Sequence, residues 1–76
     1  MKALVEYVAR SLVDNPEAVV VTEVAQRDRI VFEVAVEQGD AGKIIGRGGR
    51  MVNALRTLVK AAHTKSGKRT HVEIMA

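Results

Sequence analysis

The feature that most constrains the fold of this chain is a glycine-rich break in its second half. Four of nine consecutive residues are glycine and three are basic in the run Gly42-Lys43-Ile44-Ile45-Gly46-Arg47-Gly48-Gly49-Arg50. Glycine adopts backbone conformations that are closed to other residues, and it leaves no side chain between the backbone and a ligand. Asp40 can cap a short helix that ends at Gly46, and a longer helix follows from about Gly48 to His63. The chain must therefore turn on bare backbone between two helices.

Hydrophobic periodicity predicts a first helix and a pair of strands. An apolar stripe at every third or fourth position predicts a helix over about residues 2–13, which the segment before Pro16 ends. β-Branched residues predict a strand over 18–25, and alternating apolar residues predict a second strand over 30–37. Because the connection between these strands is short, we expect an antiparallel hairpin.

The longer helix and a last strand complete the pattern. The helix has one apolar face, expected in the core, which consists of Met51, Val52, Leu55, Leu58, Val59 and Ala62. Gly67 ends this region, and residues 70–75 predict the last strand. The order helix, strand, strand, helix, helix, strand predicts an α+β fold with the helices packed on one face of a three-stranded sheet. We expect residues 1–76 to form a single domain.

Charge is distributed unevenly along the chain. Residues 1–41 carry four basic and eight acidic side chains, a net charge of −4, whereas residues 42–76 carry eight basic and one acidic, a net charge of +7. Such asymmetry indicates an anionic partner for the basic half. The alternative is that the basic residues only solvate a helix face. The glycine-rich break lies within the basic half, and this favours a binding site.

Composition excludes several classes of protein. The chain has no cysteine, so it forms neither a disulfide framework nor a thiolate metal site, and this suits a reducing compartment. No apolar run approaches the ~20 residues of a membrane span. Residues 1–12 lack the continuous apolar run of a signal peptide. We therefore expect a cytoplasmic protein that does not enter a membrane.

The glycine-rich break has the chemistry of a nucleic-acid site. Arg47 and Arg50 flank bare backbone where a helix begins, and helix N-termini attract phosphates. Ile44 and Ile45 add an apolar surface on which flat bases can lie. We expect Ile45 to face the bases and Ile44 the core, or the reverse, because a helix of about one turn does not settle which side chain points inward. A nucleotide chain combines the phosphate and the flat apolar part that such a site would bind.

The order of elements and the glycine motif together resemble a known domain. With Ile45-Gly46-Arg47-Gly48-Gly49 between the middle helices and Gly42-Lys43-Ile44 before it, the chain resembles the K-homology (KH) domain in its type II, bacterial arrangement. The resemblance covers essentially all 76 residues. At this length the chain is similar to the KhpA-like (YlqC) family of small single-KH-domain bacterial RNA-binding proteins. One position departs from the family pattern: Gly48 leaves Arg47 as the only charge inside the loop, so we expect weaker affinity than in members with two polar residues there.

The resemblance implies a function and a set of binding residues. A KH loop clamps roughly four nucleotides of single-stranded backbone. The RNA-binding residues that follow are Gly42, Lys43, Ile44, Ile45, Gly46, Arg47, Gly48, Gly49, Arg50 and Asn53, with Val52 a further candidate for the apolar floor. The family also implies an RNA chaperone or post-transcriptional regulator without a cofactor, in a homodimer or in a heterodimer with a larger KhpB-like protein. The alternative is that the domain serves mainly as a dimerisation module of an RNA-binding complex.

The motifs of nucleotide-dependent enzymes are absent from the glycine-rich break. A Walker A motif would need glycine at Glu37 and a hydroxyl residue at Ile44, and a dinucleotide fingerprint would need glycine at Met51. No paired carboxylates for acid–base catalysis lie near the loop in the sequence. His63 and His71 lack further ligands at suitable spacing, so we expect neither an enzyme nor a metal site.

Overall fold

The computed structural model of the chain describes residues 1–62 and 67–75, and its order of elements confirms the predicted α+β fold. The helices are α1 (Lys2–Leu12), α2 (Ala41–Ile45) and α3 (Arg50–Ala62), and the strands are β1 (Val20–Ala25), β2 (Arg29–Ala35) and β3 (Arg69–Met75). Three 3₁₀ turns lie between them: η1 (Pro16–Ala18), η2 (Gln38–Asp40) and η3 (Arg47–Gly49).

Three element boundaries differ from the predictions by two residues, and two of the differences have a local reason. The third is that β2 ends at Ala35 and not at residue 37. β1 begins at Val20 and not at residue 18, because Pro16 opens a 3₁₀ turn that uses the intervening residues. α3 begins at Arg50 and not at Gly48, because Gly48 has φ 66° and ψ 18°, outside the right-handed helical region. The predicted end of this helix at His63 lies outside the described residues.

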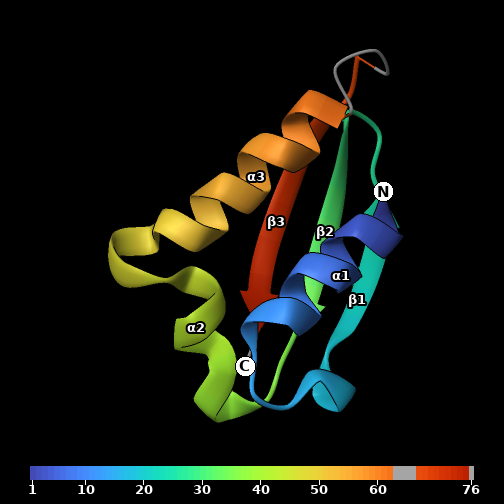
Figure 1. The fold of residues 1–76 in the computed structure, drawn as a ribbon. Helices are drawn as coiled ribbons and strands as arrows, with labels where there is room; N and C mark the ends of the chain where they lie inside the picture. Colours follow the sequence, from blue (N-terminus) through green and yellow to red (C-terminus); the bar gives the residue numbers. More distant parts are fainter. Residues whose placement is uncertain (63–66, 76) are drawn as a thin grey trace.

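The sheet is mixed, with the strand order β1-β2-β3. β1 and β2 are antiparallel, with Val20 opposite Ala35 and Ala25 opposite Ile30, which confirms the predicted hairpin. β3 pairs with the other edge of β2 and runs parallel to it. Figure 1 shows the helices on one side of this sheet, with α1 over β1 and β2 and α3 over β3. None of the described elements covers the opposite face of the sheet.

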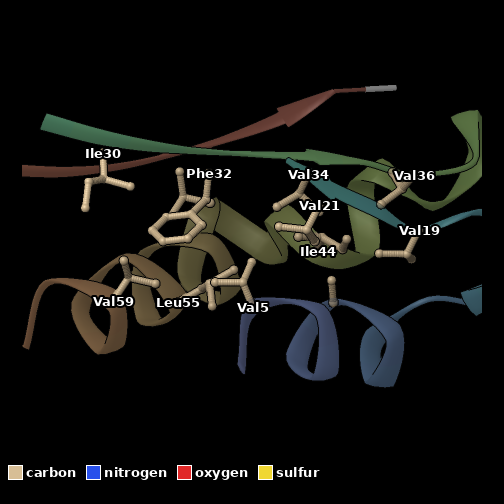
Figure 2. Close-up of a cluster of buried hydrophobic side chains, with 12 residues drawn as sticks. Val5, Val19, Val21, Ile30, Phe32, Val34, Val36, Ile44, Leu55 and Val59 are labelled. Atoms are coloured by element: carbon tan, nitrogen blue, oxygen red, sulfur yellow. The ribbon is translucent and has the colours of Figure 1, made fainter. Parts of the chain in front are cut away.

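The core lies between the sheet and the helices. Figure 2 shows that sheet side chains such as Phe32 and Val34 point toward side chains of the helices, such as Val5 and Leu55. The cluster consists of Val5, Ala9, Val19, Val21, Ile30, Phe32, Val34, Val36, Ile44, Leu55, Val59 and Val72. It confirms the alternation predicted for the second strand. Val31, on the open face, is only 8% exposed because its neighbours in the sheet are Val24 and His71.

The apolar face predicted for the longer helix is only half buried. Val52, Leu55 and Val59 are buried, but Met51 and Leu58 are 38% and 51% exposed, so the prediction that both lie in the core is wrong. The sheet accepts a single row of side chains from α3, and the remaining apolar residues lie beside this row. The three consecutive valines at the start of β1 and just before it also differ in burial, since Val19 and Val21 are buried and Val20 is exposed.

The helices are short. α1 has 11 residues and α3 has 13, whereas a membrane-spanning helix takes about 20 apolar residues. In the part of the chain that the structure describes, no helix has the length and apolar character needed to cross a membrane.

Candidate nucleic-acid interface

The turn between α2 and α3 forms an exposed loop of bare backbone, at the side of the molecule beyond β3 (Figure 1). α2 ends where the Gly46 N–H donates to the Gly42 carbonyl at 2.9 Å. Gly46, Gly48 and Gly49 then take φ values of 74°, 66° and 79°, and Arg50 begins α3. Since side chains disfavour these conformations, the sequence achieves the turn with glycine at three of its four positions.

Gly46 is required by packing as well as by its backbone conformation. A Cβ atom at this position would stand 2.6 Å from Met51 Cγ and 3.0 Å from the Met51 backbone nitrogen. At Gly48 nothing lies within 4 Å of the same point, so only the positive φ selects glycine there. Of the three loop glycines, only Gly46 is therefore needed for the close approach of the loop to the first turn of α3.

The two isoleucines of α2 have different surroundings. Ile44 is 0% exposed and belongs to the core cluster, whereas Ile45 is 40% exposed beside the loop. The alternative that the sequence left open is therefore decided: Ile44 points inward and holds α2 to the core, and Ile45 faces outward. Val52 is 5% exposed, so it is not available as part of an apolar floor.

Arg47 and Arg50 are the cations available at the loop. Both side chains are exposed, and neither forms a hydrogen bond or an ion pair with the residues that the structure describes. Arg47 lies within the loop and Arg50 at the first position of α3, where the helix dipole adds positive potential. Together they make this end of α3 attractive to an anion.

Lys43 has a different environment from the two arginines. Its Nζ donates to Asp14 Oδ2 and lies 3.6 Å from Asp40 Oδ1. The hydrogen bond to Asp14 raises the pKa of Lys43, against a lowering by burial, and the charges of Asp14 and Asp40 raise it further. Lys43 is thus positively charged at neutral pH, but two carboxylates already compensate its charge.

Asp40 occupies the N-cap position of α2 without capping the helix through its side chain, so the predicted capping role is wrong. The turn η2 runs directly into α2 and gives Asp40 φ −99° and ψ −9°, a helical conformation. Its carboxylate instead accepts the backbone N–H of Asn15 at 3.0 Å, in the connection between α1 and β1. Asp40 is only 5% exposed, and its position in the sequence did not predict this burial.

Asn53 is oriented by a residue that the sequence analysis did not single out. Arg56 Nη1 donates to Asn53 Oδ1 at 3.3 Å, and Arg56 Nη2 donates to the Val72 carbonyl of β3 at 3.2 Å. Because a guanidinium group only donates, the amide oxygen of Asn53 must face Arg56. Asn53 Nδ2 is then directed toward the loop, 3.6 Å from the point where Gly49 would carry a Cβ. Residues three positions apart lie on the same face of a helix, and this spacing could have predicted the pair from the sequence.

His71 lies in β3, with Nε2 3.5 Å from Glu73 Oε1. His63 falls outside the described residues. Among the residues that the structure describes, no three side chains of the metal-ligating types come together.

These features define a class of protein. An exposed glycine turn joins two helices that pack, with a third, on one face of a three-stranded mixed sheet, and this is the type II KH domain. Residues 2–74 match the family model described as "KhpA/KhpB, KH domain". The chain belongs to this family.

Relatives of the family match the chain along its whole length. It is 51% identical over 75 residues to the RNA-binding protein KhpA of Clostridium perfringens, which covers 99% of this chain and 100% of that protein. The proteins of the same name from Caldanaerobacter subterraneus subsp. tengcongensis and Aquifex aeolicus are 49% and 43% identical, covering 99% of this chain and 100% and 95% of those proteins. No solved structure gave a significant match.

Substitution with alanine distinguishes Gly46, which packing requires, from Gly48, which only its positive φ requires. We expect Gly48→Ala to lower the free energy of unfolding by about 1–2 kcal/mol, the cost of positive φ alone. Gly46→Ala should lower it by about 2–5 kcal/mol, because the added methyl group also collides with Met51. Urea unfolding of the two variants measures the difference. Equal losses of stability would show that the loop does not depend on the contact between Gly46 and Met51.

Proposed function

We propose that the protein binds single-stranded RNA by holding the phosphate backbone against the loop from Gly46 to Gly49. The observation that carries this proposal is the combination of three glycines at positive φ with two unpaired arginines beside them. Bare backbone allows a phosphate to approach N–H groups closely, and Arg47 and Arg50 neutralise its charge. The relatives that match the full chain carry the name RNA-binding protein.

The remaining candidate residues divide into those that contact RNA and those that support the loop. Asn53 Nδ2 is directed toward Gly49 and provides a neutral donor for a phosphate oxygen. Ile45 presents its exposed side chain to a base. Gly42 and Ile44 act from behind the loop, the first by accepting the Gly46 N–H and the second by anchoring α2 in the core.

The apolar floor is aliphatic, which sets the kind of RNA that binds. The chain has one tyrosine, one phenylalanine and no tryptophan, and Phe32 is fully buried. This site therefore does not bind RNA in the way of the RNA recognition motif (RRM), which stacks bases on aromatic side chains of its sheet. A base must leave its stack to reach Ile45, and duplex RNA should compete poorly for that reason.

The proposed activity is binding without catalysis. We place it in the cytoplasm, as an RNA chaperone or post-transcriptional regulator that needs no cofactor. The binding site is small and its residues hold few nucleotides, so the affinity would gain from a second module in the same complex through effective concentration.

A row of exposed apolar side chains on α3 favours self-association as a second function. Every third or fourth residue belongs to this row, which we call the α3 stripe and which consists of Met51, Ala54, Leu58 and Ala62. Leu58 is 51% exposed and Met51 38%, so the row presents apolar surface to the solvent. We propose that the α3 stripe packs against a second copy of the chain, or against the KH domain of a KhpB-like protein, and leaves Arg47 and Arg50 free for RNA.

The RNA proposal is tested by placing two carboxylates in the loop. We expect Arg47→Asp with Gly48→Asp to abolish binding of a short labelled single-stranded RNA, because both carboxylates face the phosphates. The matched control is Arg47→Asn with Gly48→Asn, which has the same shape and backbone strain without the charge. This control should bind weakly, with a log–log salt slope about 0.7 smaller than that of the natural chain. If the two variants bind equally while both stay folded in urea unfolding, the loop does not contact phosphate.

The self-association proposal is tested on neighbouring residues of α3. Leu58→Glu should convert a dimer to a monomer in sedimentation equilibrium, since a carboxylate would be buried in the apolar interface. Thr57→Glu, which adds the same group on the polar side of the helix, should leave the dimer intact. A natural chain that sediments as a monomer, or a Leu58→Glu variant that remains dimeric, would contradict self-association through the α3 stripe.

A further inference from the structure

The cation nearest to the loop on the α2 side has a role of its own. We infer that Lys43 is a positioning residue for the glycine loop and contacts no phosphate, an inference that rests on the proposed binding of RNA. It acts as counter-ion to Asp40 and Asp14, and through them it fixes the first turn of α2.

The contacts of Lys43 connect two parts of the chain that lie far apart in sequence. Lys43 Nζ donates to Asp14 Oδ2, in the connection that follows α1. It also lies 3.6 Å from Asp40 Oδ1, and Asp40 Oδ2 accepts the Asn15 backbone N–H at 3.0 Å. The carboxylates of Asp14 and Asp40 thus meet one lysine of α2, and the Asn15 N–H holds the second of these carboxylates. We call this set, with Lys43, the α2 anchor.

The α2 anchor is important because the Asp40 side chain is buried. The side chain of Asp40 is 7% exposed, and removing a carboxylate from water is costly unless an opposite charge and hydrogen bonds compensate it. Lys43 is its cationic partner among the residues that the structure describes. The pairing with Asp14 alone would carry little weight, because an exposed ion pair contributes little to stability. The need to neutralise Asp40 is what keeps Lys43 in place.

The charge of the α2 anchor does not favour a phosphate. One lysine and two carboxylates leave a net charge of −1 on this side of the loop, whereas Arg47 and Arg50 leave +2 on the other side. A phosphate that bound Lys43 would lie beside both carboxylates, whose negative charges would repel it. The RNA backbone is therefore expected to pass on the side of the arginines.

The α2 anchor controls the loop because α2 is short. Lys43 lies three residues before Gly46, in a helix of only five residues that also packs on the core through Ile44 and Ala41. A shift of the first turn of α2 moves Ile45 and Gly46 with it. Losing the α2 anchor should thus weaken RNA binding without removing a phosphate contact.

The salt dependence of binding distinguishes a positioning residue from a phosphate ligand. Arg47→Gln serves as the reference and should lower the log–log salt slope by about 0.7, the value for one phosphate contact to a single strand. Lys43→Met should lower the affinity several-fold and leave the slope unchanged, and Lys43→Arg should restore the affinity. Asp14→Asn should not tighten binding, because Asp40 still holds Lys43.

Several results would overturn the inference. Lys43 would be a ligand if Lys43→Met lowered the slope as much as Arg47→Gln does, or if Asp14→Asn increased the affinity. An unchanged affinity in a folded Lys43→Met variant would also contradict a positioning role. Should Lys43→Met fail to fold, the Asp14→Asn variant still decides between the two roles. By contrast, an Arg47→Gln variant with natural affinity and slope would refute the proposed RNA site and not the role of Lys43.

Discussion

The close packing of Gly46 against Met51 is the contact on which the α2–α3 unit depends. With no side chain at Gly46, the chain leaves α2 at φ 74° and passes within contact distance of the first turn of α3. This tight connection lets α2 insert Ile44 into the core while residues 47–49 remain in solvent. A bulkier residue would force the two helices apart and separate the loop from the start of α3.

The surroundings of the loop are asymmetric, and the asymmetry follows from the sequence on either side of it. Before the loop, Lys43 is matched by carboxylates that belong to the acidic half of the chain. After the loop, Arg50 lies in the basic half and has no such partner among the described residues. Arg56 is occupied in orienting Asn53 and in reaching the backbone of β3. Two cations without a side-chain partner among the described residues, Arg47 and Arg50, therefore lie at the loop and at the start of α3.

Much of the fold was predictable from local patterns. The alternation of residues 30–37 and the short connection before them predicted the hairpin, and the glycines predicted the break between helices. Family membership, first indicated by the glycine motif within this order of elements, is confirmed by the match over residues 2–74. The exposure of Leu58 was not predictable, because the face of a helix that is buried depends on where the sheet lies.

The details of the site needed the tertiary structure for the same reason. Ile44 and Ile45 are equally apolar, and only the position of the core decides which of them is free. The contact between Asp40 and Asn15 joins residues 25 positions apart, so no local pattern reveals it. Arg56 resembles any other basic residue of a helix surface until the carbonyl of Val72 is seen beside it.

The most direct test of this account is the mapping of amide chemical shifts when a short single-stranded RNA is added to the isotope-labelled protein. We expect the changes to concentrate at residues 45–50 and at Asn53. Residues of the open sheet face, such as Glu33 and His71, should keep their shifts. Changes confined to that face or to the α3 stripe, with the loop unaffected, would contradict the claim that the glycine loop holds the RNA backbone.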